Sequence, residues 1–448
     1  MASPAEQLAS NVNLGAFAKA TELKKRLWFT VLALIVYRLG TYIPVPGIDP
    51  VVLEEFFRQQ SRGVLGMVDI FAGGALSRMT VFALSIMPYI SASIIIQLMA
   101  AVVPSLEALK KEGEGGRVKL NQYTRYLTVF LAAIQAFALA TGLEHMQGPS
   151  GPAVLDPGLI FRLSTAATLT AGTVFLMWLG EQITSRGVGN GTSLIIFSSI
   201  VARVPASIIG ALELSRTGAL SVGSILLLVA IIVVVIGCVV FVERAQRRIL
   251  VQYPKRQVGN KIFGGEATHL PLKLNSAGVI PPIFASSLLL LPLTLVGFSG
   301  ADASQPWAQW ISTNLGHGRP LFMITYAALI IFFSFFYTAV VFNPKDTADN
   351  LKKYGGFVPG IRPGNNTADY LDHILTRLTV IGSIYMALVC LLPEFLTAQF
   401  NIPFYFGGTS LLIVVSVTMD TVARIQAQLI AHQYEGLIKK ANLTGKSL

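Results

Sequence analysis

Ten apolar runs, each of about the length that crosses a lipid bilayer, constrain this chain of 448 residues more than any other feature. A helix needs about 20 apolar residues to span the hydrocarbon core. Only 13% of the residues are charged and the mean hydropathy is +0.62, whereas soluble proteins carry about 25% charged residues. We predict an all-α polytopic membrane protein with spans near 27–43, 78–101, 123–143, 160–180, 192–212, 221–242, 275–297, 320–342, 374–396 and 404–422.

The lysines and arginines fall mainly on one side of such a bundle. Ten spans place both termini on the same side, together with basic clusters at 24–26, 110–125, 244–273, 345–377 and 424–446. The opposite side receives only Arg58, Arg62, Arg162, Arg203, Arg216 and Arg319. Cytoplasmic loops carry the excess of Lys and Arg in membrane proteins. Both termini are therefore predicted to be cytoplasmic.

Two of the basic loops, 243–275 and 343–373, are longer than a simple connection needs. The first has Val/Ile/Tyr stretches flanked by Pro254 and Gly264-Gly265, a pattern that predicts a hairpin standing off the membrane. Solvated positive-inside loops would explain their charge but not their length. A docking surface for an acidic or RNA-bearing partner explains both and is favoured.

The second apolar run is interrupted near its start. A short apolar piece at 64–72 ends at Gly73-Gly74, a break that frees the backbone to turn. We expect Ser77 to cap a new helix that continues through Pro88 to Met99. Irregular backbone at membrane depth is tolerated only where protein or a water-filled cavity surrounds it. This stretch therefore predicts the wall of a pathway with a segment folded into it.

A search for catalytic or metal-binding residues finds no convincing set. The five histidines are scattered, the two cysteines lie in apolar runs, and the Gly-Lys-Ser at 445–447 lacks the earlier glycine of a phosphate loop. We expect no enzyme activity, no cofactor and no metal. No Asp, Glu or Lys occupies the middle of a predicted span, which weakens the main alternative, a ten-span secondary transporter for a small solute. Sodium-coupled carriers that use backbone carbonyls keep that alternative open.

Several long stretches of the chain closely resemble the SecY family, the central subunit of the bacterial protein-conducting channel. The resemblance runs from about residue 23 to 445 in the right order, and its motifs are long and unusual. They include GGALSRMTVFALSIMPYISASIIIQL (73–98), FLMWLGEQITSRGVGNGTS (175–193), THLPLKLNSAGVIPPIFASS (268–287) and FFYTAVVFNPKDTADNLKKYGGFVPGIRPG (335–364).

The resemblance implies two pseudo-symmetric halves of five spans each, residues 27–212 and 213–422. A cytoplasmic N-terminal segment, 1–26, precedes them, and a cytoplasmic tail, 423–448, follows. The short apolar piece corresponds to the family's plug, a half-helix that closes the external funnel. The implied plug residues are Val64, Leu65, Gly66, Met67, Val68, Asp69, Ile70, Phe71 and Ala72.

Motif by motif, the resemblance also implies a ring of apolar side chains that narrows the pore. Its members are Ile86, Ile90, Thr192, Ile196, Ile283 and Ile413, and Thr192 departs from the family's aliphatic preference. A lateral gate between the second and seventh spans would use Ser91, Gln135 and Asn275, with Leu291 replacing a familiar aromatic. Judged from the residues alone, these polar side chains could equally well form ordinary hydrogen bonds between neighbouring helices as line a gate.

The family's partners and location complete the expectation. The resemblance implies SecE and SecG subunits, signal peptides and nascent membrane proteins, and docking of the SecA ATPase and the ribosome on the basic loops. The docking residues would be Arg247, Arg248, Lys255, Arg256, Lys352, Lys353 and Arg362. The Lys/Arg cluster that ends the segment 9–26 suits binding to anionic membrane lipids. A gated channel for unfolded polypeptides in a bacterial inner membrane is predicted, with a plastid membrane as the alternative.

Overall fold

The computed structural model places a helix within each of the ten predicted apolar ranges. It describes residues 21–49, 52–53, 55, 69, 72–144, 147–148, 151–216, 222–254, 256–258, 261–263, 267–298, 310, 314, 319–400 and 408–444. The helices are α3 (Thr21–Gly40), α6 (Met87–Val102), α7 (Pro104–Lys111), α8 (Glu114–Glu144), α9 (Leu159–Arg186), α10 (Gly191–Val201), α11 (Val204–Arg216), α12 (Val222–Arg244), α13 (Ile280–Phe298), α15 (Pro320–Val341), α16 (Pro344–Lys353), α17 (Asn365–Phe400) and α18 (Gly408–Thr444).

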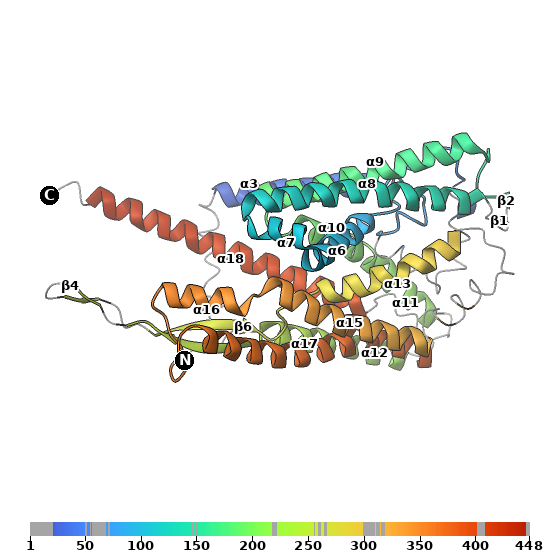
Figure 1. The fold of residues 1–448 in the computed structure, drawn as a ribbon. Helices are drawn as coiled ribbons and strands as arrows, with labels where there is room; N and C mark the ends of the chain where they lie inside the picture. The colour runs from blue at the N-terminus through green and yellow to red at the C-terminus, as the bar shows by residue number, and fades with distance from the viewer. Residues whose placement is uncertain are drawn as a thin grey trace.

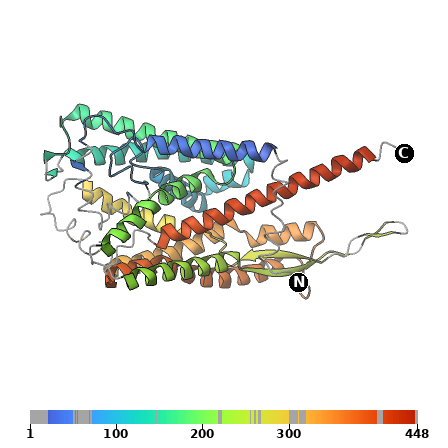
Figure 2. The same ribbon diagram turned by 180° about the vertical axis from the view of Figure 1, so that it is seen from behind.

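The long helices run roughly parallel and form a layered bundle (Figure 1). Helices α3, α8 and α9 lie along one side, while α12, α15 and α17 lie along the other. Helices α6, α10 and α13 lie between these layers, and α18 crosses the bundle and extends beyond it, as the view from behind also shows (Figure 2). The main buried cluster draws side chains from both layers and from the helices between them.

Six helices of the described chain are long and apolar enough to cross a membrane. A seventh candidate is the pair α6 and α7, which bends by 98° at Val103. Bulky apolar side chains on the outside of the bundle are exposed, for example Trp28 on α3 and Phe332 on α15. An apolar exterior around a packed interior is what hydrocarbon requires, so this is a membrane protein fold.

The helix predicted to begin at Ser77 begins instead at Met87. Residues 72–86 form consecutive turns, because their backbone groups find partners elsewhere: Val45 N–H donates to Met79 O (2.9 Å), and Val81 N–H donates to Ile43 O (3.0 Å). Met79 and Ser85 adopt positive φ angles of 44° and 52°, which no right-handed helix contains. The prediction that Ser77 caps a helix is therefore wrong.

The fifth apolar range is also divided, with α10 ending at Val201 and α11 beginning at Val204. The Asn190 side chain caps α10 by accepting from the Thr192 and Ser193 backbone N–H groups. Immediately after this cap, Gly191 lies against α9, and a Cβ at this position would lie 2.0 Å from Gly180 O. Only glycine lets the two backbones approach so closely.

We expect Gly191→Ala to lower the thermal stability of the purified protein by about 1–3 kcal/mol, because overpacking forces α9 and α10 apart. Gly210→Ala in α11 is the matched control, since a Cβ there meets nothing within 4 Å. The measurement is the loss of the monodisperse peak of each purified variant as the temperature rises. Equal shifts in the two variants would contradict the close contact.

The predicted hairpin is confirmed. Strands β3 (Gln246–Gln252) and β6 (Ala267–Lys273) pair antiparallel, and β4 (Arg256–Val258) and β5 (Lys261–Phe263) pair beyond them. The hairpin extends from the same end of the bundle as the C-terminal part of α18 (Figure 1). We call this the basic end. A separate two-stranded pair, β1 (Gln147–Gly148) and β2 (Gly151–Pro152), lies at the opposite end.

The two long loops form one unit at the basic end. Gln252 of β3 and Phe357 of the second loop exchange both backbone hydrogen bonds at 2.9 Å. Beneath this bridge lies a small hydrophobic cluster of Ile249, Leu272, Val358, Leu371 and Leu375. Because the cluster draws on the hairpin, the second loop and α17, the loops are fixed to each other and to the bundle.

Candidate polar cavity, apolar ring and plug contact

A cavity of about 660 Å³ lies among α6, α8, α9, α10 and α13. Its wall is polar where the first turns of α8 and the last turns of α9 face it, through side chains such as Asn121, Thr124 and Thr184. Ile90, Ile196 and Ile283 also line it. A polar cavity thus meets a group of branched aliphatic side chains contributed by three different helices.

Those aliphatic side chains belong to the predicted ring. The main buried cluster brings together Ile86, Ile90, Ile196, Ile283 and Ile413. Ile413 is 0% exposed, and the Tyr326 and Thr409 hydroxyls, 3.1 Å apart, join its helix α18 to α15. Thr192, the sixth predicted member, is partly exposed and lines the cavity outside this cluster.

Charged residues on the cavity wall are paired with each other. Arg125 of α8 donates from Nε to Glu181 Oε1 (2.9 Å) and from Nη2 to Glu181 Oε2 (2.7 Å). Such bidentate geometry fixes both planar groups. The pair links α8 to α9 beside the uncharged lining. Within the described residues, no group of three His, Cys, Asp or Glu side chains is placed to hold a metal ion.

The predicted gate residues lie on neighbouring elements. Helix α13 packs against both α6, which carries Ser91, and α8, which carries Gln135. Asn275 is buried before α13 begins, and its Nδ2 donates to Glu243 Oε1 (2.7 Å) and Gly278 O (3.1 Å). The structure thus adds Glu243 of α12 as the partner of Asn275. The side chain of Leu291 lies outside the described residues.

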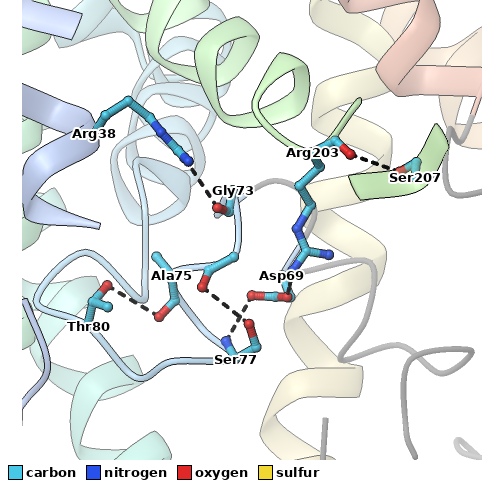
Figure 3. Close-up of polar contacts among 9 residues, drawn as sticks. Arg38, Asp69, Gly73, Ala75, Ser77, Thr80, Arg203 and Ser207 are labelled. Atoms are coloured by element: carbon cyan, nitrogen blue, oxygen red, sulfur yellow. Dashed lines mark hydrogen bonds and ion pairs between the residues drawn. The ribbon is translucent and has the colours of Figure 1, made fainter. Parts of the chain in front are cut away.

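Of the predicted plug, Asp69 and Ala72 are described, and the other seven residues lie outside the described chain. Asp69 is buried, and its carboxylate accepts from the Ser77 backbone N–H (2.8 Å) and from Arg203 Nη2 (Figure 3). Nearby, Arg38 Nη1 donates to Gly73 O at 3.3 Å. Asp69, at the described end of the predicted plug, therefore contacts the α10–α11 break.

Arg203 is not among the predicted site residues, and the charge pattern alone places it on the outer side. In the structure it lies at the break between α10 and α11, inside the apolar stretch 191–210. An ionisable side chain within an apolar run is itself a signal of function. That signal was present in the sequence, while its partner, 134 residues earlier, was not predictable from spacing.

The predicted docking residues lie on the joined loops at the basic end. Arg247 and Arg248 are exposed on β3, Lys352 and Lys353 are exposed in the last turn of α16, and Arg362 is exposed in the second loop. Arg256 lies on β4, and Lys255 lies outside the described residues. The structure thus gathers Arg247, Arg248, Lys352, Lys353 and Arg362 at the basic end.

A layered bundle with an apolar exterior, together with a polar cavity that is also lined by buried aliphatic side chains, defines a helical membrane protein. A sequence model of the SecY family matches residues 80–422. The chain belongs to the SecY family.

Two curated relatives are named protein translocase subunit SecY. The one from Rickettsia conorii is 56% identical, covering 94% of this chain and 97% of its own length. The one from Escherichia coli K12 is 54% identical, covering 95% and 96%. Among solved structures, a protein-conducting channel has the same fold, with a TM-score of 0.64 and 18% identity over 90% of this chain and 92% of its own. Sec61 in the canine ribosome–channel complex has a TM-score of 0.61 and 18% identity, again over 90% of this chain and 92% of its own.

Proposed function

We propose that this protein is the channel subunit through which unfolded secretory polypeptides cross a membrane and from which transmembrane segments pass sideways into the bilayer. The observation that carries the proposal is the meeting of a polar cavity with the aliphatic group Ile90, Ile196 and Ile283. Family membership and the two translocase relatives support it.

The residue types suit passage of polypeptide without binding it. A narrow group of branched aliphatic side chains offers no hydrogen bonds, so it dewets and resists ions. The same side chains yield to any passing residue without selecting it. The cavity beside them offers hydroxyl and amide groups, such as Thr184 and Asn121, that solvate an extended chain, and the plug closes the far side.

The finer architecture is proposed with the function. The ten helical ranges form two halves of five spans, 27–212 and 213–422, which separate at a seam between α6 and α13. The basic end faces the cytoplasm of a bacterial cell, so both termini are cytoplasmic and the membrane is the inner membrane. SecE and SecG subunits complete the complex.

The driving partners dock at the basic end. The exposed cations on β3, α16 and the second loop form a joint positive surface that suits the SecA ATPase or ribosomal RNA. The similarity in fold to Sec61, which was solved in a ribosome complex, supports this part of the proposal. No catalytic role is assigned to this chain, and the energy that drives translocation comes from the partner.

Site-specific crosslinking tests the proposal. Cys238 and Cys390 are replaced by serine, and a single cysteine is introduced at Ile90, which lines the cavity. In membranes supplied with SecA and ATP, we expect it to crosslink to a secretory chain arrested during transfer. The control cysteine at Leu388, on the exposed face of α17, should not react with the arrested chain.

The alternative outcome points to a transporter. If neither cysteine contacts the arrested chain, and the purified protein takes up a small solute, a secondary transporter replaces the channel. Crosslinking without SecA or ATP would show binding alone, and would contradict transfer through the cavity.

A further inference from the structure

Two arginines approach one exposed tyrosine just beyond the end of α3. Arg38 Nη2 donates to the Tyr42 hydroxyl at 3.5 Å, and the Arg38 Cζ lies 5.6 Å from the centre of the Tyr42 ring. The Arg78 Cζ lies 4.4 Å from the same ring centre. We propose that Arg38, Arg78 and Tyr42 form a binding site for the phosphate group of a membrane lipid, in the leaflet away from the basic end.

The backbone that carries these side chains is fixed. Pro44 and Thr80 form an isolated antiparallel bridge, and the residues on either side of it are joined by backbone hydrogen bonds of 2.9 and 3.0 Å. Tyr42 lies two residues before Pro44, and Arg78 lies two residues before Thr80. The pairing therefore places both side chains before any ligand arrives.

Three guanidinium groups gather at the turn formed by Gly73 and Gly74. Arg38 Nη1 donates to Gly73 O at 3.3 Å (Figure 3). A Cβ at Gly74 would lie 3.2 Å from Arg78 Nη2 and 3.4 Å from Arg203 Nη2. Like charges this close repel each other strongly in an apolar environment. Such an arrangement is stable only where anions compensate it.

The described residues supply one anion for these three cations. Asp69 pairs with Arg203, and in the described part of the chain no carboxylate forms an ion pair with Arg38 or Arg78. Arg78 Nη1 is buried without a hydrogen-bond partner. The face of the Tyr42 ring attracts both cations but carries no net charge. Two positive charges therefore remain for a ligand.

The depth of the site suits the headgroup layer. Helix α3 rises about 1.5 Å per residue, so its end at Gly40 lies roughly 20 Å beyond residue 27, where the predicted span begins. The hydrocarbon core is about 30 Å thick, and arginine side chains extend from such positions to the interface. The chain after α3 leads away from the basic end, because Ile48 forms a bridge with Val154, two residues beyond β2 (Figure 1).

The surroundings favour a lipid over a soluble anion. Leu39 and Ile43, which flank Tyr42 closely in the chain, are both exposed, as is Ile35 one turn before Leu39. They offer an apolar surface to acyl chains directly beside the cations. Tyrosine suits this level of a membrane because its ring is apolar and its hydroxyl is polar. A phosphodiester that carries acyl chains matches both parts of the site.

Lipid titration of the purified protein, kept together with the subunits that copurify with it, tests the proposal. The sample is delipidated in a neutral detergent, phosphatidylglycerol is added, and the rise in unfolding temperature is followed. We expect Arg38→Gln and Arg78→Gln each to raise the lipid concentration needed for half of this rise about fivefold. The double variant should raise it further, and native mass spectrometry should count one retained lipid fewer.

Arg319→Gln is the matched control, because Arg319 is also exposed, precedes α15 and lies at the end of the bundle away from the basic end. It should leave the titration unchanged. An equal loss in this variant would show that the charge of any arginine suffices, and would overturn the site. An unchanged lipid count in the double variant would show that a protein partner or no ligand occupies it, with the same consequence.

Two further additions identify the group that is recognised. A glycolipid with the same acyl chains and no phosphate should give a rise that does not depend on Arg38 or Arg78. If it replaces phosphatidylglycerol in full, the site binds hydrocarbon and not phosphate. Inorganic phosphate at the same concentration should have no effect, and an equal rise would identify a soluble anion instead.

Tyr42→Phe and Tyr42→Leu keep the test open where an arginine variant does not accumulate. The phenylalanine retains the ring that holds both cations, so we expect nearly unmodified lipid binding. The leucine removes the ring and should weaken binding as the arginine variants do. Equal binding by the two variants would contradict the assigned role of Tyr42. None of these measurements uses export, so they stand apart from the test of the channel function.

Discussion

Replacing Ile283 with asparagine is expected to let ions leak through the resting protein and to relax its demand for an intact signal sequence. Ile283 is buried beside the cavity and belongs to the same cluster as Ile413. An amide at this point binds water that the aliphatic group excludes, a difference of about 1–3 kcal/mol. That corresponds to a leak about tenfold or more above the unmodified level. Ile413→Asn should act in the same direction.

The measurement is ion flux through proteoliposomes, together with export of a secretory chain whose signal is defective. Ile280→Asn is the control, since Ile280 lies one turn earlier on α13, lines the same cavity and is only partly buried at the edge of the cluster. Ile283→Val, which stays aliphatic, should retain the seal. Unchanged leak and unchanged stringency in both ring variants would contradict the ring assignment.

Arg362→Glu is expected to reduce partner-driven translocation by about tenfold while the protein stays folded. Arg362 is exposed and its carbonyl accepts from the Thr367 hydroxyl at 3.0 Å, so the backbone position does not depend on the guanidinium. Reversing the charge places like charges across a docking interface, and the tenfold loss corresponds to about 1.4 kcal/mol of binding free energy. The loss should be larger at low salt, where screening is weakest.

SecA-dependent export at two ionic strengths measures this effect, and thermal stability of the purified variant shows that folding is retained. Arg319→Glu is the control, because Arg319 precedes α15 at the end of the bundle away from the docking loops. Normal export by the Arg362 variant at both ionic strengths would show that this residue does not dock the partner.

The sequence predicted the elements whose causes are local. Every apolar range contains a helix, and the Val/Ile/Tyr pattern with Pro254 correctly indicated the hairpin at β3 and β6. Both depend on residue type and spacing within one segment. The aliphatic residues assigned to the ring through family resemblance lie in one buried cluster, and their role at a seal stays a prediction.

The errors arose where partners are distant in the chain. Ser77 carried a good capping signal, but residues 72–86 take backbone partners from Ile43 and Val45, so the helix begins only at Met87. The charge pattern places Arg203 on the outer side, and it gives no sign of the acceptor, Asp69, which comes from another segment. The partner of Asn275, Glu243 of α12, is also distant in the chain, and the place of Asn275 at a gate stays a prediction. Tertiary contacts override local signals at such points.

The bridge between Gln252 and Phe357 has a consequence for the affinity of any partner that touches both loops. Two independent flexible loops would each lose conformational freedom when they bind, at about 0.5–1.5 kcal/mol for every side chain immobilised. Here the shared cluster under the bridge fixes both before the partner arrives. The two loops therefore form a single rigid binding surface. A partner that binds it contacts cations from two segments that lie about a hundred residues apart in the sequence.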